Sequence, residues 1–201
     1  MSQLVNFIEK GGPVMWPLLI LTLVAIMFMI ERFILLMKSR LNTDMVLNEL
    51  KGYLEKKDVK GATNYVSKFK GPIASMLIAG LEKFDKGSLS VEKVVETTGT
   101  LEMTKLEKGL NILATISNIG PLLGFLGTVT GMIRSFEAIA KAGLNNPSAV
   151  ALGISEALIT TASGLIIAIP TLAAYNYFTS LVSGYLSDME NASTVLLDYA
   201  E

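Results

Sequence analysis

Three long runs of apolar residues divide the chain, and each is long enough to cross a membrane. Charged side chains are absent from 11–30 and from 109–133, and Glu156 is the single one within 142–187. A helix needs about 20 mainly apolar residues to span the hydrocarbon core of a bilayer. The pattern therefore predicts an all-α integral membrane protein with three transmembrane helices, at residues 13–37, 109–134 and 151–178.

The segments between these runs are also expected to be helical for most of their length. Leu41, Val46, Leu50 and Leu54 recur at helical spacing among charged residues, which is typical of an amphipathic helix. We expect residues 38–108 to form a helical domain and the tail 179–201 to continue the third span as a helix. A helix beginning near 91 should run on into the second span. Residues 1–12 are predicted to form an interfacial helix, and residues 135–150 a loop.

The basic residues predict the orientation of the chain in the membrane. Residues 38–108 contain 13 of the 17 lysines and arginines. Segments rich in Lys and Arg stay on the cytoplasmic side. This rule places 38–108 and the C-terminus inside, and the N-terminus and the 135–150 loop on the periplasmic side.

Composition removes several classes of function. Hydrophobic residues make up 51% of the chain, charged residues only 17%, and the net charge of −1 gives no basic field for nucleic acid. Cysteine and histidine are both absent from the sequence. The chain therefore lacks the commonest nucleophilic, acid–base and metal-binding side chains. We expect no enzyme and no cofactor.

Polar residues inside the third span are the first candidates for function. A carboxylate within a span costs at least about 2.5 kcal/mol and usually faces a helix bundle or a water-filled path. Glu156 shares a helix face with Thr160, and Thr161 turns toward the adjoining face. Carboxylate and hydroxyl oxygens can replace the hydration of a cation. A glutamate that merely reaches the lipid headgroups is the alternative.

The second span carries a smooth face of small residues. Gly124, Gly127 and Gly131 follow one another at helical spacing, which lets a neighbouring helix approach closely. Gly164 continues the face of Glu156 in the third span. We predict that these four glycines serve helix packing. Thr128 lies level with the packed face and is a further candidate for an ion pathway.

Two long motifs in these spans resemble a known family. The runs GPLLGFLGTVTGMIRSF, residues 120–136, and GISEALITTASGLIIAIPTLAAYNYF, residues 153–178, are similar to the MotA/TolQ/ExbB proton-channel family, with ExbB and TolQ closest. The N-terminal GGPVMWPLLILT…IERF, residues 11–33, also resembles the first span of ExbB. The likeness covers all three spans in order, whereas residues 38–108 contribute little to it.

The resemblance implies a role in energising transport across the bacterial envelope. Members of this type sit in the inner membrane as pentamers around a single-span ExbD- or TolR-like partner, whose aspartate carries the translocated ion. Ion flow then drives TonB-dependent or Tol-type work through a TonB- or TolA-like protein. Carried over by position, the pathway threonines of the family correspond to Thr128 and Thr161, and its intramembrane glutamate to Glu156.

One position departs from the proton-coupled pattern and leaves the ion open. ExbB-type members often have alanine before the third-span threonine, whereas this chain has Thr160 before Thr161. A double threonine resembles the sodium-driven members, so Na⁺ held by Thr128, Thr160 and Thr161 is the alternative to H⁺. A membrane scaffold that anchors a partner and conducts nothing is the alternative function. The sequence does not name the envelope system that the chain serves.

Overall fold

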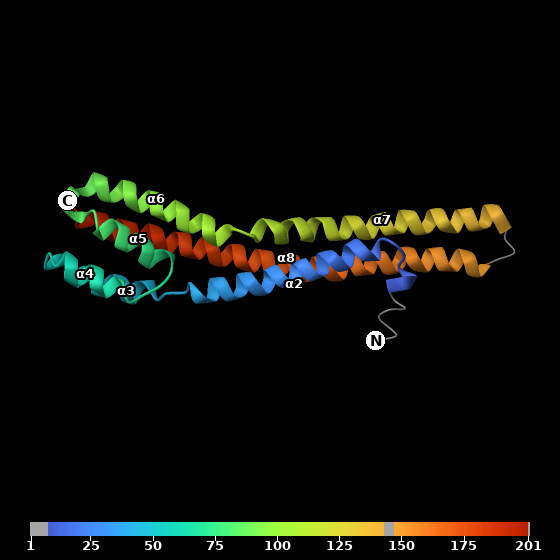
Figure 1. Cartoon of the computed structure of the whole chain (residues 1–201), viewed down its shortest axis with the longest axis horizontal. Coiled ribbons are helices and arrows are strands. Elements are labelled where there is room, and N and C mark those ends of the chain that lie inside the picture. The colour runs from blue at the N-terminus through green and yellow to red at the C-terminus, as the bar shows by residue number, and fades with distance from the viewer. Residues whose placement is uncertain (1–7, 143–146, 201) are drawn as a thin grey trace. The chain divides into compact units, whose positions relative to one another are not determined.

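The computed structural model describes residues 8–142 and 147–200, and this part of the chain is helical without any strand (Figure 1). Three of its helices, α2, α7 and α8, are long and apolar enough to cross a membrane. The predicted all-α class with three candidate spans is therefore confirmed. The elements in chain order are α2 (Met15–Lys38), α3 (Thr43–Glu55), α4 (Val59–Val66), α5 (Pro72–Leu81), the 3-10 helix η1 (Phe84–Lys86), α6 (Ser88–Glu107), α7 (Leu110–Ala142) and α8 (Pro147–Asp198).

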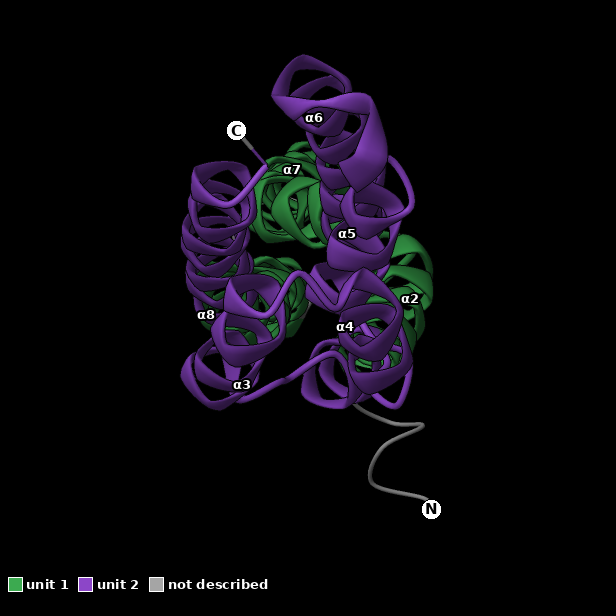
Figure 2. Cartoon of the chain, turned by 90° about the vertical axis from the view of Figure 1, so that its left-hand side faces the viewer, with its two compact units in different colours: residues 1–31, 109–176 green, residues 32–108, 177–201 purple. Residues whose placement is uncertain are grey.

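The chain divides into two compact units, each built from two separate stretches of sequence (Figure 2). Unit 1 consists of residues 1–31 and 109–176, and unit 2 of residues 32–108 and 177–201. The long helices α2 and α8 each contribute to both units. Unit 1 thus holds the apolar spans, and unit 2 holds the charge-rich helices.

In unit 1, helices α7 and α8 approach so closely that their backbones touch. A Cβ atom placed on Gly164 would lie 2.5 Å from the carbonyl oxygen of Gly120, and one on Gly131 would lie 2.6 Å from that of Gly153. Real Cβ contacts do not come this close, so these positions accept only glycine at this helix separation. Helix α2 adds an apolar contact through a cluster of buried residues, namely Val14, Met15, Leu18, Ala25, Ile116 and Ile167.

The outer surface of unit 1 is strongly apolar. Leu122 and Phe125 on α7 and Leu158 on α8 are each 66% exposed, and further large apolar side chains follow along both helices. Exposed apolar surface on this scale is suited to lipid tails or to neighbouring subunits. The surface agrees with the membrane location that composition predicts.

Unit 2 has a conventional hydrophobic core, with capped helices around it. Leu50, Leu77, Leu81 and Leu196 are among its buried residues, drawn from α3, α5 and α8. Asn42 caps α3 by accepting a hydrogen bond from the backbone N–H of Met45 at 3.2 Å, and Asp58 caps α4 through Gly61 at 2.9 Å. Side-chain caps of this kind satisfy amide groups that the first helical turn leaves free.

Two polar contacts join distant parts of unit 2. The Tyr185 hydroxyl donates to the carbonyl oxygen of Leu36 at 2.6 Å, and the Thr43 hydroxyl donates to the Asp188 carboxylate at 3.0 Å. Burial raises the pKa of the Tyr185 phenol above its usual value, because desolvation disfavours the charged form. The phenol therefore stays a hydrogen-bond donor over the whole physiological pH range.

Three expectations about the connections need correction. Helix α6 does not run into the second span, because the chain turns at Lys108 and Gly109, where Gly109 has φ +89°. The 135–150 loop is much shorter than predicted, since α7 continues to Ala142 and α8 begins at Pro147. The predicted interfacial helix at 1–12 appears as one helical turn at 8–10, and residues 1–7 lie outside the described part. Helix α8 continues past Pro170 as expected.

The close approach of α7 and α8 predicts opposite effects of alanine at two glycines of α8. Gly164→Ala should destabilise the protein by roughly 1–3 kcal/mol, because the new methyl group meets the backbone of α7. Gly184→Ala is the matched control, since nothing lies within 4 Å of a Cβ there and alanine favours a helix. Thermal unfolding in detergent measures both. Equal stability of the two variants would contradict the tight α7–α8 contact.

Candidate functional site

The four predicted pathway residues all lie in unit 1, on α7 and α8. Thr128 belongs to α7, whereas Glu156, Thr160 and Thr161 belong to consecutive turns of α8. Both helices contribute to the glycine-lined contact between them. We call this contact, from Gly120 to Ser135 on α7 and from Gly153 to Gly164 on α8, the α7–α8 seam.

Glu156 is held by an arginine of the facing helix. One guanidinium nitrogen of Arg134, Nη1, donates to both carboxylate oxygens of Glu156 at 2.7 Å. The Glu156 side chain is only 9% exposed, whereas that of Arg134 is 49% exposed. A carboxylate so deeply buried needs a compensating charge, and Arg134 supplies it.

Sequence reasoning missed Arg134 as a member of the site. Arg134 is the first charged residue after the charge-free run 109–133, so the pattern indicates only the end of a span at this position. Its distance from Glu156, 22 residues along the chain, carries no signal by itself. The signal becomes visible only when the two spans are drawn as an antiparallel pair, which brings the last charged position of one beside the first of the other.

The N-terminal segment lies directly over this ion pair. Gly12 has φ +69°, and a Cβ atom on it would collide with the Glu156 carboxylate and lie 3.2 Å from Nη1 of Arg134. A cavity of about 460 Å³ borders the pair and is lined by Glu9, Lys10, Leu152, Gly153 and Ser155 in addition to the pair itself. The carboxylate of Glu156 therefore borders a cavity that charged and polar side chains share with glycine and leucine.

Thr160 occupies a different environment from the one that a cation ligand requires. Its side chain is 0% exposed, and its hydroxyl donates to the carbonyl oxygens of Glu156 and Ala157, both at 3.0 Å. The side chain fills the space left by Gly127, where a Cβ atom would collide with the threonine. Thr160 thus packs the seam, and its geometry gives no support to a sodium ion bound there.

Thr161 and Thr128 border the seam on its accessible side. Thr161 is half-buried, and its hydroxyl donates across the seam to the carbonyl oxygen of Gly124 at 3.2 Å. Thr128, also half-buried, lies one turn beyond Gly124 on α7 and donates to the carbonyl oxygen of Phe125 at 2.6 Å. Each hydroxyl donates its hydrogen bond to a backbone carbonyl oxygen. The lone pairs of the hydroxyl oxygen can therefore still accept a hydrogen bond from water or a hydrated proton.

The predicted packing glycines all contact the opposite helix. A Cβ atom on Gly124 would lie 3.0 Å from the carbonyl oxygen of Thr160, and Gly127, Gly131 and Gly164 meet α8 or α7 at least as closely. Ser135 adds a contact that the sequence did not suggest, because its hydroxyl donates to the carbonyl oxygen of Val150 at 3.0 Å. The seam is therefore closed by backbone contact along its length and by polar contacts near one end.

Comparison with known proteins finds a matching family and several similar sequences. The sequence model of the MotA/TolQ/ExbB proton channel family matches residues 68–191, which is more than half of the chain. The putative biopolymer transport protein ExbB homolog of Methanothermobacter thermautotrophicus is 28% identical over 191 residues, covering 94% of this chain and 67% of that protein. The putative biopolymer transport protein ExbB-like 1 of Synechocystis sp. is 32% identical over 189 residues, covering 90% and 72%.

Other relatives are longer than this chain. The biopolymer transport protein ExbB of Pseudomonas putida is 37% identical over 113 residues, which cover 56% of this chain but only 33% of that protein. The matched family segment contains α7 and most of α8, and therefore the whole seam with its ion pair and threonines. On these matches, the chain belongs to the MotA/TolQ/ExbB proton channel family.

Proposed function

We propose that this chain is the channel-forming subunit of an ion-driven motor in the bacterial inner membrane, working with an ExbD- or TolR-like single-span partner. Family membership and relatives named as biopolymer transport proteins support a TonB-dependent or Tol-type role. The observation that carries the proposal is the α7–α8 seam, where two accessible threonine hydroxyls lie on the same pair of helices as a charge-balanced carboxylate.

The ion pair explains why a partner is needed. Glu156 is the only carboxylate within the spans 109–134 and 151–178, and Arg134 already neutralises it. A carrier of cations has to bind and release its ion, which a carboxylate clamped by a guanidinium does poorly. We therefore assign the carrier to an aspartate of the partner, with Thr128 and Thr161 accepting hydrogen bonds beside it.

The polar side of the seam has to be kept from lipid. Hydroxyl and carboxylate groups in hydrocarbon are costly, so helices bearing them gather around a shared interior. This supports a homo-oligomer, a pentamer by family, with Thr128, Thr161 and Glu156 toward a central cavity that holds the partner's spans. The basic domain 38–108 then faces the cytoplasm and the N-terminus the periplasm.

The burial of Thr160 favours protons over sodium as the driving ion. A sodium ion in a low-dielectric site needs several oxygen ligands at once, whereas a proton needs one acceptor at a time. Thr160 is the residue that would distinguish a sodium site, and its hydroxyl lies inside the helix contact. We therefore propose H⁺ as the translocated ion, with Na⁺ as the alternative.

The first prediction concerns the need for a partner. Liposomes that contain only this chain should show little ion flux under a membrane potential, because the one carboxylate of the spans 109–134 and 151–178 is already paired. Adding the single-span partner should produce ion flux, and a protonophore serves as the control for the maximal proton flux of the same liposomes. Robust flux through the chain alone would contradict this assignment.

The second prediction separates the structural and the conducting roles of Glu156. Arg134→Gln should destabilise the protein by about 3–5 kcal/mol, because it leaves the buried carboxylate of Glu156 without its partner. Glu156→Gln should cost less, because the half-exposed guanidinium of Arg134 can be solvated by water. The double variant Arg134→Gln/Glu156→Gln should recover stability in detergent yet keep less than about a tenth of the partner-dependent flux. Full recovery of flux would mean that the pair only joins the helices and takes no part in the pathway.

The third prediction concerns the threonines. Thr161→Val and Thr128→Val preserve side-chain shape but remove the hydroxyls, so each should abolish partner-dependent proton flux. Thr160→Val should be mild and unaffected by sodium, and Thr171→Val, also buried and bonded to its own helix, is the matched control. A sodium-driven motor would instead need about tenfold more sodium after Thr160→Val, the effect of losing about 1.4 kcal/mol of binding.

A further inference from the structure

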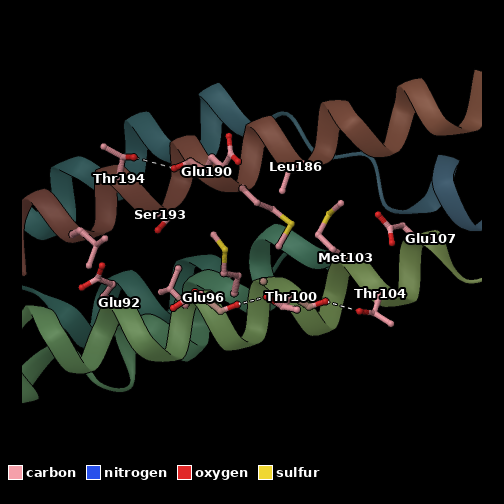
Figure 3. Close-up of a pocket in the computed structure, with 15 residues that line it drawn as sticks. Glu92, Glu96, Thr100, Met103, Thr104, Glu107, Leu186, Glu190, Ser193 and Thr194 are labelled. Carbon is pink, nitrogen blue, oxygen red and sulfur yellow. Dashed lines mark hydrogen bonds between the residues drawn. The ribbon is translucent and has the colours of Figure 1, made fainter.

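Unit 2 contains an open groove between α6 and the end of α8 (Figure 3). Its volume is about 700 Å³, and its floor is formed by three methionines, Met76 from α5, Met103 from α6 and Met189 from α8. Above the floor, residues spaced three and four apart on both helices line the two walls. Met side chains adapt their shape to different apolar partners, which is why binding grooves for helices often contain them.

Helix α6 is packed on too little of its surface for a helix of its length. Val91, Val95 and Leu106 are the buried residues among its 20, whereas Leu89 is 80% and Leu101 is 58% exposed. Helical stability in proteins comes mainly from packing of an apolar face. Leu89 and Leu101 lie outside the groove, but of the eight α6 residues that line it only Val95 is buried, so the groove side of α6 is also largely unpacked in the described part of the chain.

The groove is acidic and offers acceptors for hydrogen bonds. Four glutamates line it, and none of its described lining residues is a lysine or an arginine. The hydroxyls of Thr100, Thr104 and Thr194 donate to backbone carbonyls of their own helices, so their protons are already used. The four glutamates are Glu92, Glu96 and Glu107 on α6 and Glu190 on α8, and all are exposed.

We propose that this groove binds a cationic amphipathic helix, contributed by the cytoplasmic flank of the single-span partner. Apolar side chains of that helix would contact the methionines, and its lysines or arginines would pair with the four glutamates. The lined stretch of α6, from Glu92 to Glu107, is about 22 Å long, which matches roughly four helical turns.

The identity of the occupant rests on the proposed function. A single-span protein keeps its Lys- and Arg-rich flank on the cytoplasmic side of the membrane. On α8 the groove-lining residues begin at Leu186, eight residues after the predicted third span ends, and on α6 they end at Glu107, two residues before the predicted second span begins. A basic flank of the partner is therefore expected on the same side of the membrane as the acidic groove that can bind it.

Binding can be measured without ion flux. The probe is a synthetic helical peptide with lysines on one face and leucines on the other, titrated by fluorescence anisotropy onto the full chain in nanodiscs of zwitterionic lipid. Empty nanodiscs correct for binding to lipid. Glu96→Gln/Glu190→Gln should weaken binding about fivefold, the effect of losing two exposed charge pairs. Glu49→Gln/Glu82→Gln, which removes two exposed carboxylates outside the groove, should leave it unchanged.

An uncharged substitution that fills the groove distinguishes binding in the groove from general electrostatic attraction of the peptide to the protein surface. Thr100→Trp should reduce binding at least tenfold without altering charge, because the indole fills the space above the methionines. The proposal is overturned if the peptide binds this variant as well as the wild type, or if a peptide with glutamine in place of lysine binds equally well.

A second copy of this chain is the competing occupant. The chain has no cysteine, so Ser193→Cys places a single thiol in the groove. Fast maleimide labelling of the oligomer without partner supports a free groove, whereas protection shows that a neighbouring subunit covers it and overturns the proposal. If the wild-type protein conducts ions with its partner but does not bind the peptide, the groove proposal is wrong and the proposed function stands. If it binds the peptide but conducts no ions, the proposed motor function is wrong and the groove proposal stands.

Discussion

The direct contact between the backbones of α7 and α8 is the constraint on which the functional unit depends. Lipid gives apolar helices no hydrophobic reason to associate, so close packing and a few polar contacts have to hold them. Gly120, Gly131, Gly153 and Gly164 allow this approach because a Cβ atom at any of them would meet backbone of the opposite helix. Glu156, Thr160 and Thr161 each contact α7 across it, and Thr160 fills the space left by Gly127.

The same contact decides how charge is arranged inside the bilayer. Glu156 alone would be an expensive group in a span, but Arg134 balances it at 2.7 Å and Gly12 lies over the pair. The balanced pair ties the helices together and leaves the threonine hydroxyls as the polar groups available to a partner. Under the function proposed above, a clamped carboxylate in this chain and a free carrier in its partner would allow ion flow only when the subunits are assembled.

The two units are stabilised by different physics. Unit 2 buries leucines, valines and methionines in a core like that of a water-soluble protein, with side-chain caps on its helices. Unit 1 has a much smaller apolar cluster and exposes large apolar side chains. Helices α2 and α8 both contribute to both units, and α8 adds Met189, Ala192, Val195 and Leu196 to the core of unit 2.

The sequence by itself determined the helical class, the three apolar spans and the family. Charge-free runs are set by the cost of charge in hydrocarbon, and the two long motifs carry the family's chemistry in local order. It also indicated Gly124, Gly127, Gly131 and Gly164 as small-residue faces, because helical spacing is a local property. Only the tertiary structure decided that Arg134 pairs with Glu156, that Thr160 is buried while Thr161 stays accessible, and that α6 ends at Glu107. The first two outcomes depend on the rotation and register of one helix against another, which no local pattern encodes. The end of α6 depends on the positive φ of Gly109, a local stop signal that the helical pattern around it masked.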